Sequence, residues 1–213
     1  MEIMDQVLMA PTILKTNWAR ENKVLAAFME TKYYTLVMKA FEQLDTCALY
    51  KSYLHGSKHI ERVLLLGALI AWRESLDEHD TTILLYACAY HDIGRINDCR
   101  DDEHGTRSAE MLKSEHFTWL RDSLNSQDQR ILLAMIAAHS HNDYDMFRIG
   151  QKNQIADENM TRYMELASCL KDADNLDRVR LHDLDTTHLR HPSSVDLVPF
   201  AESLFHKYKT KLV

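Results

Sequence analysis

Three His-Asp dipeptides lie in the chain, and one of them has the surroundings that a metal site needs. They are His79-Asp80, His91-Asp92 and His182-Asp183. His91-Asp92 ends an apolar run, residues 83–90, which places both side chains at the buried end of a predicted helix. A buried imidazole and a buried carboxylate need partners, and a divalent cation is a strong partner for both. We therefore predict that His91 and Asp92 bind a metal ion.

The other two dipeptides lack this setting. Asp80 stands just before the apolar run and is predicted to be the N-cap of the same helix. His182 and Asp183 are surrounded by polar residues and are predicted to lie on the surface.

Three further side chains fall on the apolar faces of separate predicted helices, because residues i, i+3, i+4 and i+7 share one face. They are His59 with Val63 and Ile70, His139 with Leu132 and Ile136, and Asp174 with Leu166 and Leu170. One inward histidine is usually a core residue bonded to a carbonyl, and one aspartate near a helix end is usually a cap. Several such residues from different helices favour a shared metal site, since burying them all without a cation would be costly.

The elements that position these residues are predicted to be helices throughout. The chain has only 5 Gly and 3 Pro, and the alternating pattern of strands is absent. We predict an all-α fold with seven or more helices packed orthogonally in one domain. The predicted helices cover residues 18–44 (as one or two helices), 58–76, 80–92, 104–114, 126–139 and 161–177, with a last one starting near Pro199. The 126–139 helix is predicted to start with a capping box at Ser126–Gln129.

The bulk composition is that of a soluble globular protein. The 213 residues are 46% hydrophobic and 27% charged, and we expect a single domain over 1–213 with its metal-site core at about 50–180 and helical extensions on both sides. No apolar run approaches the ~20 residues of a membrane span, and the start of the chain lacks the pattern of a signal peptide. The 4 scattered cysteines suit a reducing compartment, so a cytoplasmic protein without a membrane partner is predicted.

The net charge of -7 argues against general nucleic-acid binding but allows a small phosphorylated ligand held by a few local Arg and Lys residues. The oligomeric state is open. The 10 Met and the apolar residues near the N-terminus could form a homodimer contact, and ordinary core packing explains them equally well.

Three segments in this order resemble the HD superfamily of metal-dependent phosphohydrolases. They are His59-Ile60-Glu61-Arg62-Val63, His91-Asp92-Ile93-Gly94-Arg95 and Asp172-Ala173-Asp174-Asn175-Leu176-Asp177. The resemblance implies an all-helical fold and a metal held by His59, His91, Asp92 and Asp174. Residues 104–112 resemble the auxiliary histidine segment of two-metal members, and residues 139–141 lie where those members carry another histidine. This adds His104 and His139 as implied ligands.

The chain departs from two branches of that superfamily. Arg95 and Ile96 follow Gly94, where the alarmone hydrolases have an HDxxED-like segment. Residues 142–144 follow the histidines, where the cyclic dinucleotide phosphodiesterases have a GYP motif. The substrate is therefore not fixed by the resemblance.

Histidine and carboxylate ligands suit one or two ions of Mn, Fe, Co, Ni or Zn. Asp92 can bridge two ions, because a carboxylate has two oxygens. A metal-bound water with a pKa near ~7 would supply hydroxide to attack phosphorus, with Arg95 stabilising the phosphoryl charge. The alternative for Arg95 is an ion pair with Asp98 or Asp101. Two neighbours have supporting roles in this scheme. Arg62 either contacts the phosphoryl group or fixes a ligand helix through an ion pair. Asp177 orients a ligand histidine or a metal-bound water.

The predicted function is therefore metal-dependent hydrolysis of a phosphomonoester or phosphodiester of a small metabolite or nucleotide. Two alternatives stay open: a di-iron oxygenase, since some HD-like folds carry such sites, and a non-catalytic nucleotide-binding regulatory domain. The remaining histidines are predicted to be ordinary surface or core residues: His55, His116, His188, His191 and His206. Residues 189–194 are predicted to form a structural loop.

Overall fold

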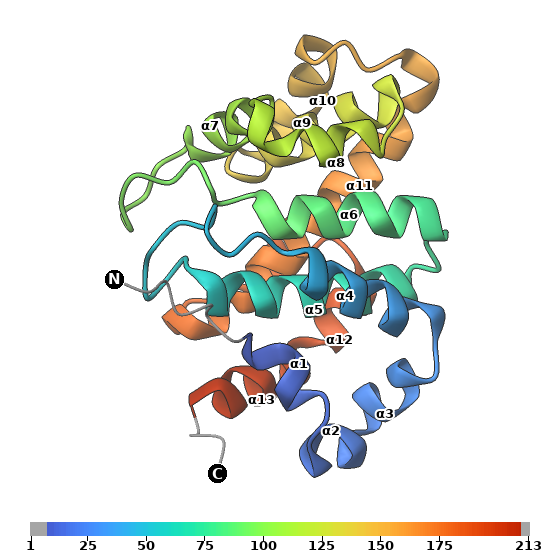
Figure 1. Ribbon diagram of the computed structural model, residues 1–213, viewed down its shortest axis with the longest axis vertical. Coiled ribbons are helices and arrows are strands. Elements are labelled where there is room, and N and C mark those ends of the chain that lie inside the picture. The colour runs from blue at the N-terminus through green and yellow to red at the C-terminus, as the bar shows by residue number, and fades with distance from the viewer. Residues whose placement is uncertain (1–7, 210–213) are drawn as a thin grey trace.

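The computed structural model describes residues 8–209, and within that range all regular secondary structure is helical (Figure 1). This confirms the all-α prediction. The longer helices are α4 (Lys32–Gln43), α5 (Ser57–Arg73), α6 (Glu78–Tyr90), α7 (His104–Met111), α9 (Ser126–His139), α10 (Asp143–Lys152), α11 (Asp157–Leu176) and α13 (Val198–Lys209). The shorter ones are α1 (Met9–Ile13), α2 (Asn17–Glu21), α3 (Lys23–Met29), α8 (Thr118–Asp122) and α12 (Pro192–Asp196), with 3-10 turns at Glu115–Phe117, Asp177–Leu181 and Thr186–His188.

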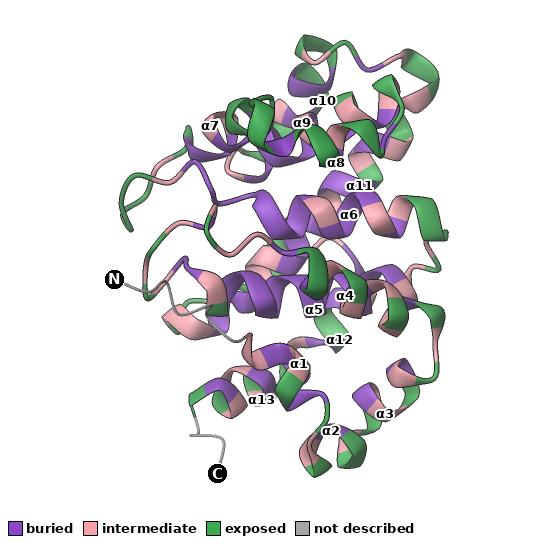
Figure 2. Cartoon of the chain, viewed as in Figure 1, coloured by how far each residue is buried: buried purple, intermediate pink, exposed green. Residues whose placement is uncertain are grey.

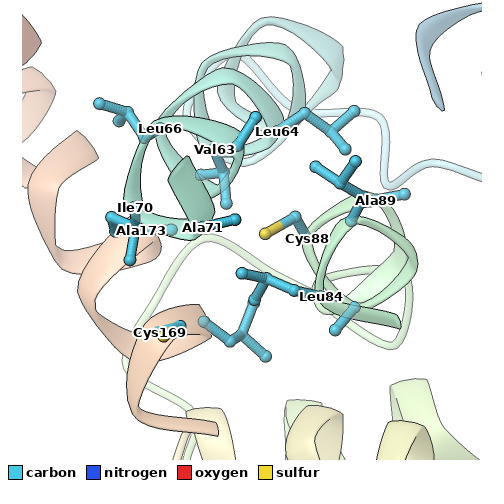
Figure 3. Close-up of a cluster of buried hydrophobic side chains, with 14 of the residues drawn as sticks. Val63, Leu64, Leu66, Ile70, Ala71, Leu84, Cys88, Ala89, Cys169 and Ala173 are labelled. Atoms are coloured by element: carbon cyan, nitrogen blue, oxygen red, sulfur yellow. The ribbon is translucent and has the colours of Figure 1, made fainter. Parts of the chain in front are cut away.

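Helix α5 forms the centre of the fold. It packs against α4, α6 and α11, and every residue from 59 to 71 is buried. A helix that is enclosed on all sides must be apolar on all sides, which explains the run Val63–Ala71. Figure 3 shows Val63 and Ile70 of α5 gathered with Leu84 of α6 and Ala173 of α11.

The other helices cover this centre from two ends. Helices α7 to α10 lie at one end of the molecule, and α1, α2, α3 and α13 lie at the other (Figure 1). Their outer faces are exposed, whereas α5 and α6 are mostly buried (Figure 2). In the described residues, no helix is both long enough and apolar enough to span a membrane.

The N-caps of two helices differ from those predicted. The Asp77 side chain accepts the N–H of Asp80, so α6 begins at Glu78 and the predicted cap at Asp80 is wrong. The Asn125 side chain accepts the N–H groups of Gln127 and Asp128, so the cap of α9 is Asn125 and not Ser126. In both cases a side-chain oxygen just outside the helix reaches the second or third helical amide.

The N-terminal region is also divided more finely than the predicted one or two helices. Residues 17–43 form three helices, and the Asn22 side chain caps the second by accepting from Val24 and Leu25. Helices α1, α8, α10 and α12 have no counterpart among the predicted elements, and α1, α8 and α12 span one turn or little more. A single turn carries too little periodicity to be recognised in a sequence.

Candidate metal centre

The six predicted ligands meet where the ends of five helices converge. They are His59 in the first turn of α5, His91 and Asp92 just after α6, His104 at the start of α7, His139 at the end of α9 and Asp174 in the last turn of α11. Five of them are buried, and the side chain of Asp174 is 28% exposed. Asp174 is thus the ligand candidate through which the centre reaches solvent.

Two glycines allow α7 to approach the centre closely. A Cβ at Gly94 would lie 2.3 Å from the backbone nitrogen of Ser108 on α7. A Cβ at Gly105 would lie 2.5 Å from the carbonyl oxygen of Ile136 and 2.9 Å from Nδ1 of His139. Real side chains do not tolerate such contacts, so these glycines let His104 come within reach of α9.

The first group of ligand atoms comes from α5, α6 and α11. Nε2 of His59 lies 3.2 Å from Nε2 of His91. Oδ1 of Asp174 lies 3.4 Å from the first of these nitrogens and 3.8 Å from the second. Oδ2 of Asp92 lies 3.5 and 3.8 Å from the same two atoms. Two imidazoles and two carboxylates therefore surround one point.

The second group lies on the other side of Asp92. Nε2 of His104 and Nε2 of His139 are 2.8 Å apart. Oδ1 of Asp92 lies 3.0 Å from the His104 nitrogen and 3.6 Å from the His139 nitrogen. The two oxygens of one carboxylate thus face two different pairs of histidines, which is the arrangement of a bridging ligand.

Hydrogen bonds on the far side of each ring fix the tautomers of all four histidines. Nδ1 of His59 faces Oδ2 of Asp177 at 2.7 Å. Nδ1 of the other three faces a backbone carbonyl: Cys88 for His91, Asp101 for His104 and Ile136 for His139. Carboxylates and carbonyls only accept, so each Nδ1 carries the proton and each Nε2 directs a lone pair into the centre.

Facing lone pairs at these distances require a proton or a cation between them. The proton is disfavoured, because burial lowers the pKa of His91 to about 3 and also lowers the pKa of His139. In addition, Oδ1 of Asp92 is buried and makes no hydrogen bond within the described residues. A divalent ion would satisfy the nitrogens and this oxygen together, so the donor set fits a metal.

The two carboxylates of the centre are held ionised. Burial alone would raise the pKa of Asp92, but the surrounding imidazoles, His91 first, keep it well below its usual range. The pKa of Asp174 is also lowered, because His91 and His59 outweigh its burial. Ionised oxygens are the form that coordinates a cation.

Asp177 holds the His59 ring from behind. Besides accepting from Nδ1 of His59, its carboxylate accepts from Nε and Nη2 of Arg62, the latter at 2.9 Å. Arg62 is stacked in turn against the rings of Phe205 and Tyr208. The ion pair considered for Arg62 is therefore present, and Asp177 contacts the histidine as predicted for a residue that orients a ligand.

His55 also lies in the centre, although it was predicted to be an ordinary histidine. Its Nδ1 lies 3.1 Å from Oδ2 of Asp92 and 3.2 Å from Nη2 of Arg180. His55, His59 and Asp92 each offer a ligand atom, and these three atoms lie within 4.8 Å of one another. His55 precedes α5, so no helical periodicity marked it; the available signal was its spacing of four residues from His59.

Arg95 lies beside the bridging aspartate. Its Nε is 2.9 Å from Oδ1 of Asp92, so the two side chains form an ion pair, although these two atoms do not share a hydrogen bond. The alternative partners are otherwise engaged, since Asp101 pairs with Arg107 and Asp98 accepts from Ser52. The Arg95 guanidinium therefore borders the centre.

Three other histidines are paired outside the centre. His79 meets Asp128 and His116 meets Asp45. His191 is hydrogen-bonded to Asp172. Asp172 and Asp174 are two residues apart on α11 and so lie on different faces of that helix.

The comparisons with known proteins agree with this geometry. A family model described as the HD domain matches residues 56–179, more than half of the chain. The match contains all six predicted ligands, and His55 precedes it by one residue. Neither the curated proteins nor the solved structures contain a significant match.

Proposed function

Because the chain belongs to the HD domain family, we propose that it is a metal-dependent phosphohydrolase acting on a small phosphorylated metabolite or nucleotide. The family as a whole consists of metal-dependent hydrolases. The particular proposal is a centre for two divalent ions. One is held by His59, His91 and Asp174, the other by His104 and His139, and Asp92 bridges them.

One observation carries the two-ion proposal. Two pairs of histidine nitrogens with fixed tautomers face each other, at 3.2 and 2.8 Å, on opposite sides of one ionised carboxylate. A single ion would leave one pair with opposed lone pairs in a buried site, where an unmet polar group is expensive. Ions of Mn, Fe, Co, Ni or Zn suit this donor set.

Divalent ions bound there would lower the pKa of a bound water and polarise a phosphoryl oxygen. The remaining roles belong to the chain. Asp177 keeps the proton of His59 on Nδ1, so that Nε2 remains a donor atom. Arg95 supplies a fixed positive charge beside the centre, where negative charge develops on the phosphoryl oxygens. No covalent nucleophile is needed.

The direction of substrate entry follows from exposure. Asp174 is 28% exposed, whereas the side chains of His59, His91 and Asp92 are 2% exposed or less. A phosphoryl group would therefore approach past Asp174 at the end of α11. The net charge of -7 also argues against a nucleic-acid polymer as the substrate.

The test is phosphate release from a panel of nucleotides and phosphoesters with Mn, Co, Mg, Zn and Fe added to metal-free protein. Asp92→Ala should abolish release, because the bridge is lost, and should keep the helical circular dichroism spectrum. Asp183→Ala is the matched control, since Asp183 forms an exposed ion pair with Arg178 and does not contact the proposed ligands.

Release by the wild type and the control, but not by Asp92→Ala, supports the proposal. Full activity of Asp92→Ala with metal bound would refute the mechanism. Bound iron with oxygen consumption and no phosphate release would favour an oxygenase instead. Tight nucleotide binding without turnover, whatever the metal, would favour a regulatory domain.

A further inference from the structure

A second cluster of metal-binding side chains lies on another face of α11. Glu165 and Cys169 are four residues apart on this helix, and His191 approaches them as the N-cap residue of α12. Nε2 of His191 lies 3.1 Å from Oε1 of Glu165 and 4.0 Å from Sγ of Cys169. The three donor atoms all lie within 4.8 Å of one another.

Asp172 holds the other side of the His191 ring. Its Oδ2 lies 2.8 Å from Nδ1 of His191, and the carboxylate also accepts the backbone N–H groups of Arg190 and His191. Asp172 is fully buried. A carboxylate that fixes one ring nitrogen and directs the other toward a cluster is the arrangement typical of zinc-binding histidines.

The separations fit a tetrahedral zinc ion. Zn–N and Zn–O bonds of about 2.0 Å and a Zn–S bond of about 2.3 Å place the nitrogen roughly 3.3 Å from the oxygen and roughly 3.6 Å from the sulfur. The distances of 3.1 and 4.0 Å differ from these values by less than half an ångström. The Glu165 side chain is 49% exposed, which gives an ion a path from solvent.

We propose that Glu165, Cys169 and His191 form a second metal site for a zinc-like ion, separate from the HD centre, with water as the fourth ligand. This proposal does not rest on the proposed hydrolase function. The proposed role of the ion is structural. The site would connect α11 with residues 182–191, which follow the 3-10 turn Asp177–Leu181 at the end of the matched region. The ion would fasten this segment to the helix that also carries Asp174.

Binding exchanges two protons for one divalent ion. Without metal, the hydrogen bond that Nδ1 of His191 donates to Asp172 raises the pKa of His191 to about 11, so the ring is an imidazolium between two carboxylates. Burial raises the pKa of the Cys169 thiol, so the sulfur is protonated. On binding, metal–nitrogen, metal–sulfur and metal–oxygen bonds form, and the Nε2–H and S–H protons leave to solvent. The total charge of the cluster is unchanged, so the buried Asp172 keeps a neutralising partner.

The cluster is not suited to thiol catalysis. Cys169, His191 and Asp172 have the order of a nucleophile, a base and an orienting carboxylate. However, Cys169 is fully buried, and Figure 3 shows it on α11 at the edge of the apolar cluster with Ala173. A substrate molecule is too large to reach that sulfur. A single metal ion could enter between Cys169 and the partly exposed side chain of Glu165.

The experiment uses thiolate-to-metal charge transfer, because the HD centre contains no cysteine. Full-length protein with the exposed cysteines changed, Cys47→Ser and Cys99→Ser, is titrated with Co²⁺ and Cd²⁺ in the near ultraviolet. We expect a charge-transfer band, the release of about two protons per ion at this site, and loss of the band in Cys169→Ser. Cys88→Ser is the matched control, since Cys88 is equally buried and its side chain belongs to no cluster of metal-binding side chains in residues 8–209.

Two further variants keep the test decisive if Cys169→Ser does not fold. Glu165→Gln changes an exposed side chain, and we expect a band with at least tenfold weaker affinity. Asp92→Ala disrupts the HD centre, and we expect the band to persist unchanged. The absence of a band in the parent protein, a band that survives Cys169→Ser, or an unchanged affinity in Glu165→Gln would overturn the proposal. Either result would leave the hydrolase proposal standing.

Discussion

The substitution Asp177→Asn tests whether the support behind His59 is as important as the ligands. The variant keeps the size of the side chain and one acceptor oxygen, but it removes the charge that faces Arg62 and His59. It also replaces the second oxygen by an NH2 group, which can only donate toward these two donors. The change should therefore disturb stability and metal binding together.

The magnitude follows from burial. The Arg62 and Asp177 side chains are 5% and 1% exposed, so the variant leaves a buried guanidinium without its charged partner. Losing one partner of a buried pair costs about 3–5 kcal/mol. For a domain of this size each kcal/mol lowers Tm by roughly 2–4 °C, so we expect a decrease of about 6 °C or more. Loss of an orienting carboxylate weakens metal binding by about 10–100-fold.

The pH dependence has a definite sign. Burial would raise the pKa of Asp177, but Arg62 and then His59 outweigh burial and lower it. The stabilisation is therefore present above the unfolded pKa of ~3.9 and is lost as the pH falls through the folded value. The difference in unfolding free energy between wild type and Asp177→Asn should be large at pH 7 and should shrink below about pH 4.

The assay is urea unfolding of metal-free protein in chelator, followed by separate metal titration. Asp183→Asn is the control, because its pair with Arg178 is exposed on both sides and should change stability by about 1 kcal/mol or less. If Asp177→Asn matched the wild type in both stability and metal affinity, the proposed role of this carboxylate would be refuted.

Three other predictions use the same centre. Gly105→Ala should separate α7 from α9, since its Cβ would lie 2.9 Å from Nδ1 of His139. Metal analysis should then find one ion per chain instead of two. Two tightly bound ions would show that the close approach of α7 to α9 is not required. Arg95→Met should lower kcat by about 100-fold with little change in metal content, if the guanidinium stabilises transition-state charge; a change in KM alone would indicate a binding role instead. The metal-free protein should lose about 1.4 kcal/mol of unfolding free energy per pH unit as the pH falls below 6.5. The reason is that burial lowers the pKa of His91 in the folded protein to about 3, so the unfolded chain binds the proton first. Equal unfolding free energies at pH 7 and pH 5 would refute this.

The sequence by itself determined the fold class and the residues that come together. Helical periodicity placed His59, His139 and Asp174 on inward faces, and His91-Asp92 followed an apolar run, so their convergence could be expected from spacing alone. Asp172, two residues earlier, falls on a different face of the same helix from Asp174. The two residues do face different partners, since Asp174 lies near His59 and Asp172 binds His191.

Only the tertiary structure decided the contacts of residues outside regular helices. His55 and His191 lie in connecting segments, where no periodicity relates a side chain to the core, and they prove to face the carboxylates of Asp92 and Glu165. The N-cap of α6 at Asp77 was missed for a related reason, because several aspartates near a helix start can serve as caps. Spacing along one helix is fixed by backbone geometry, whereas contacts between segments depend on how the whole chain packs.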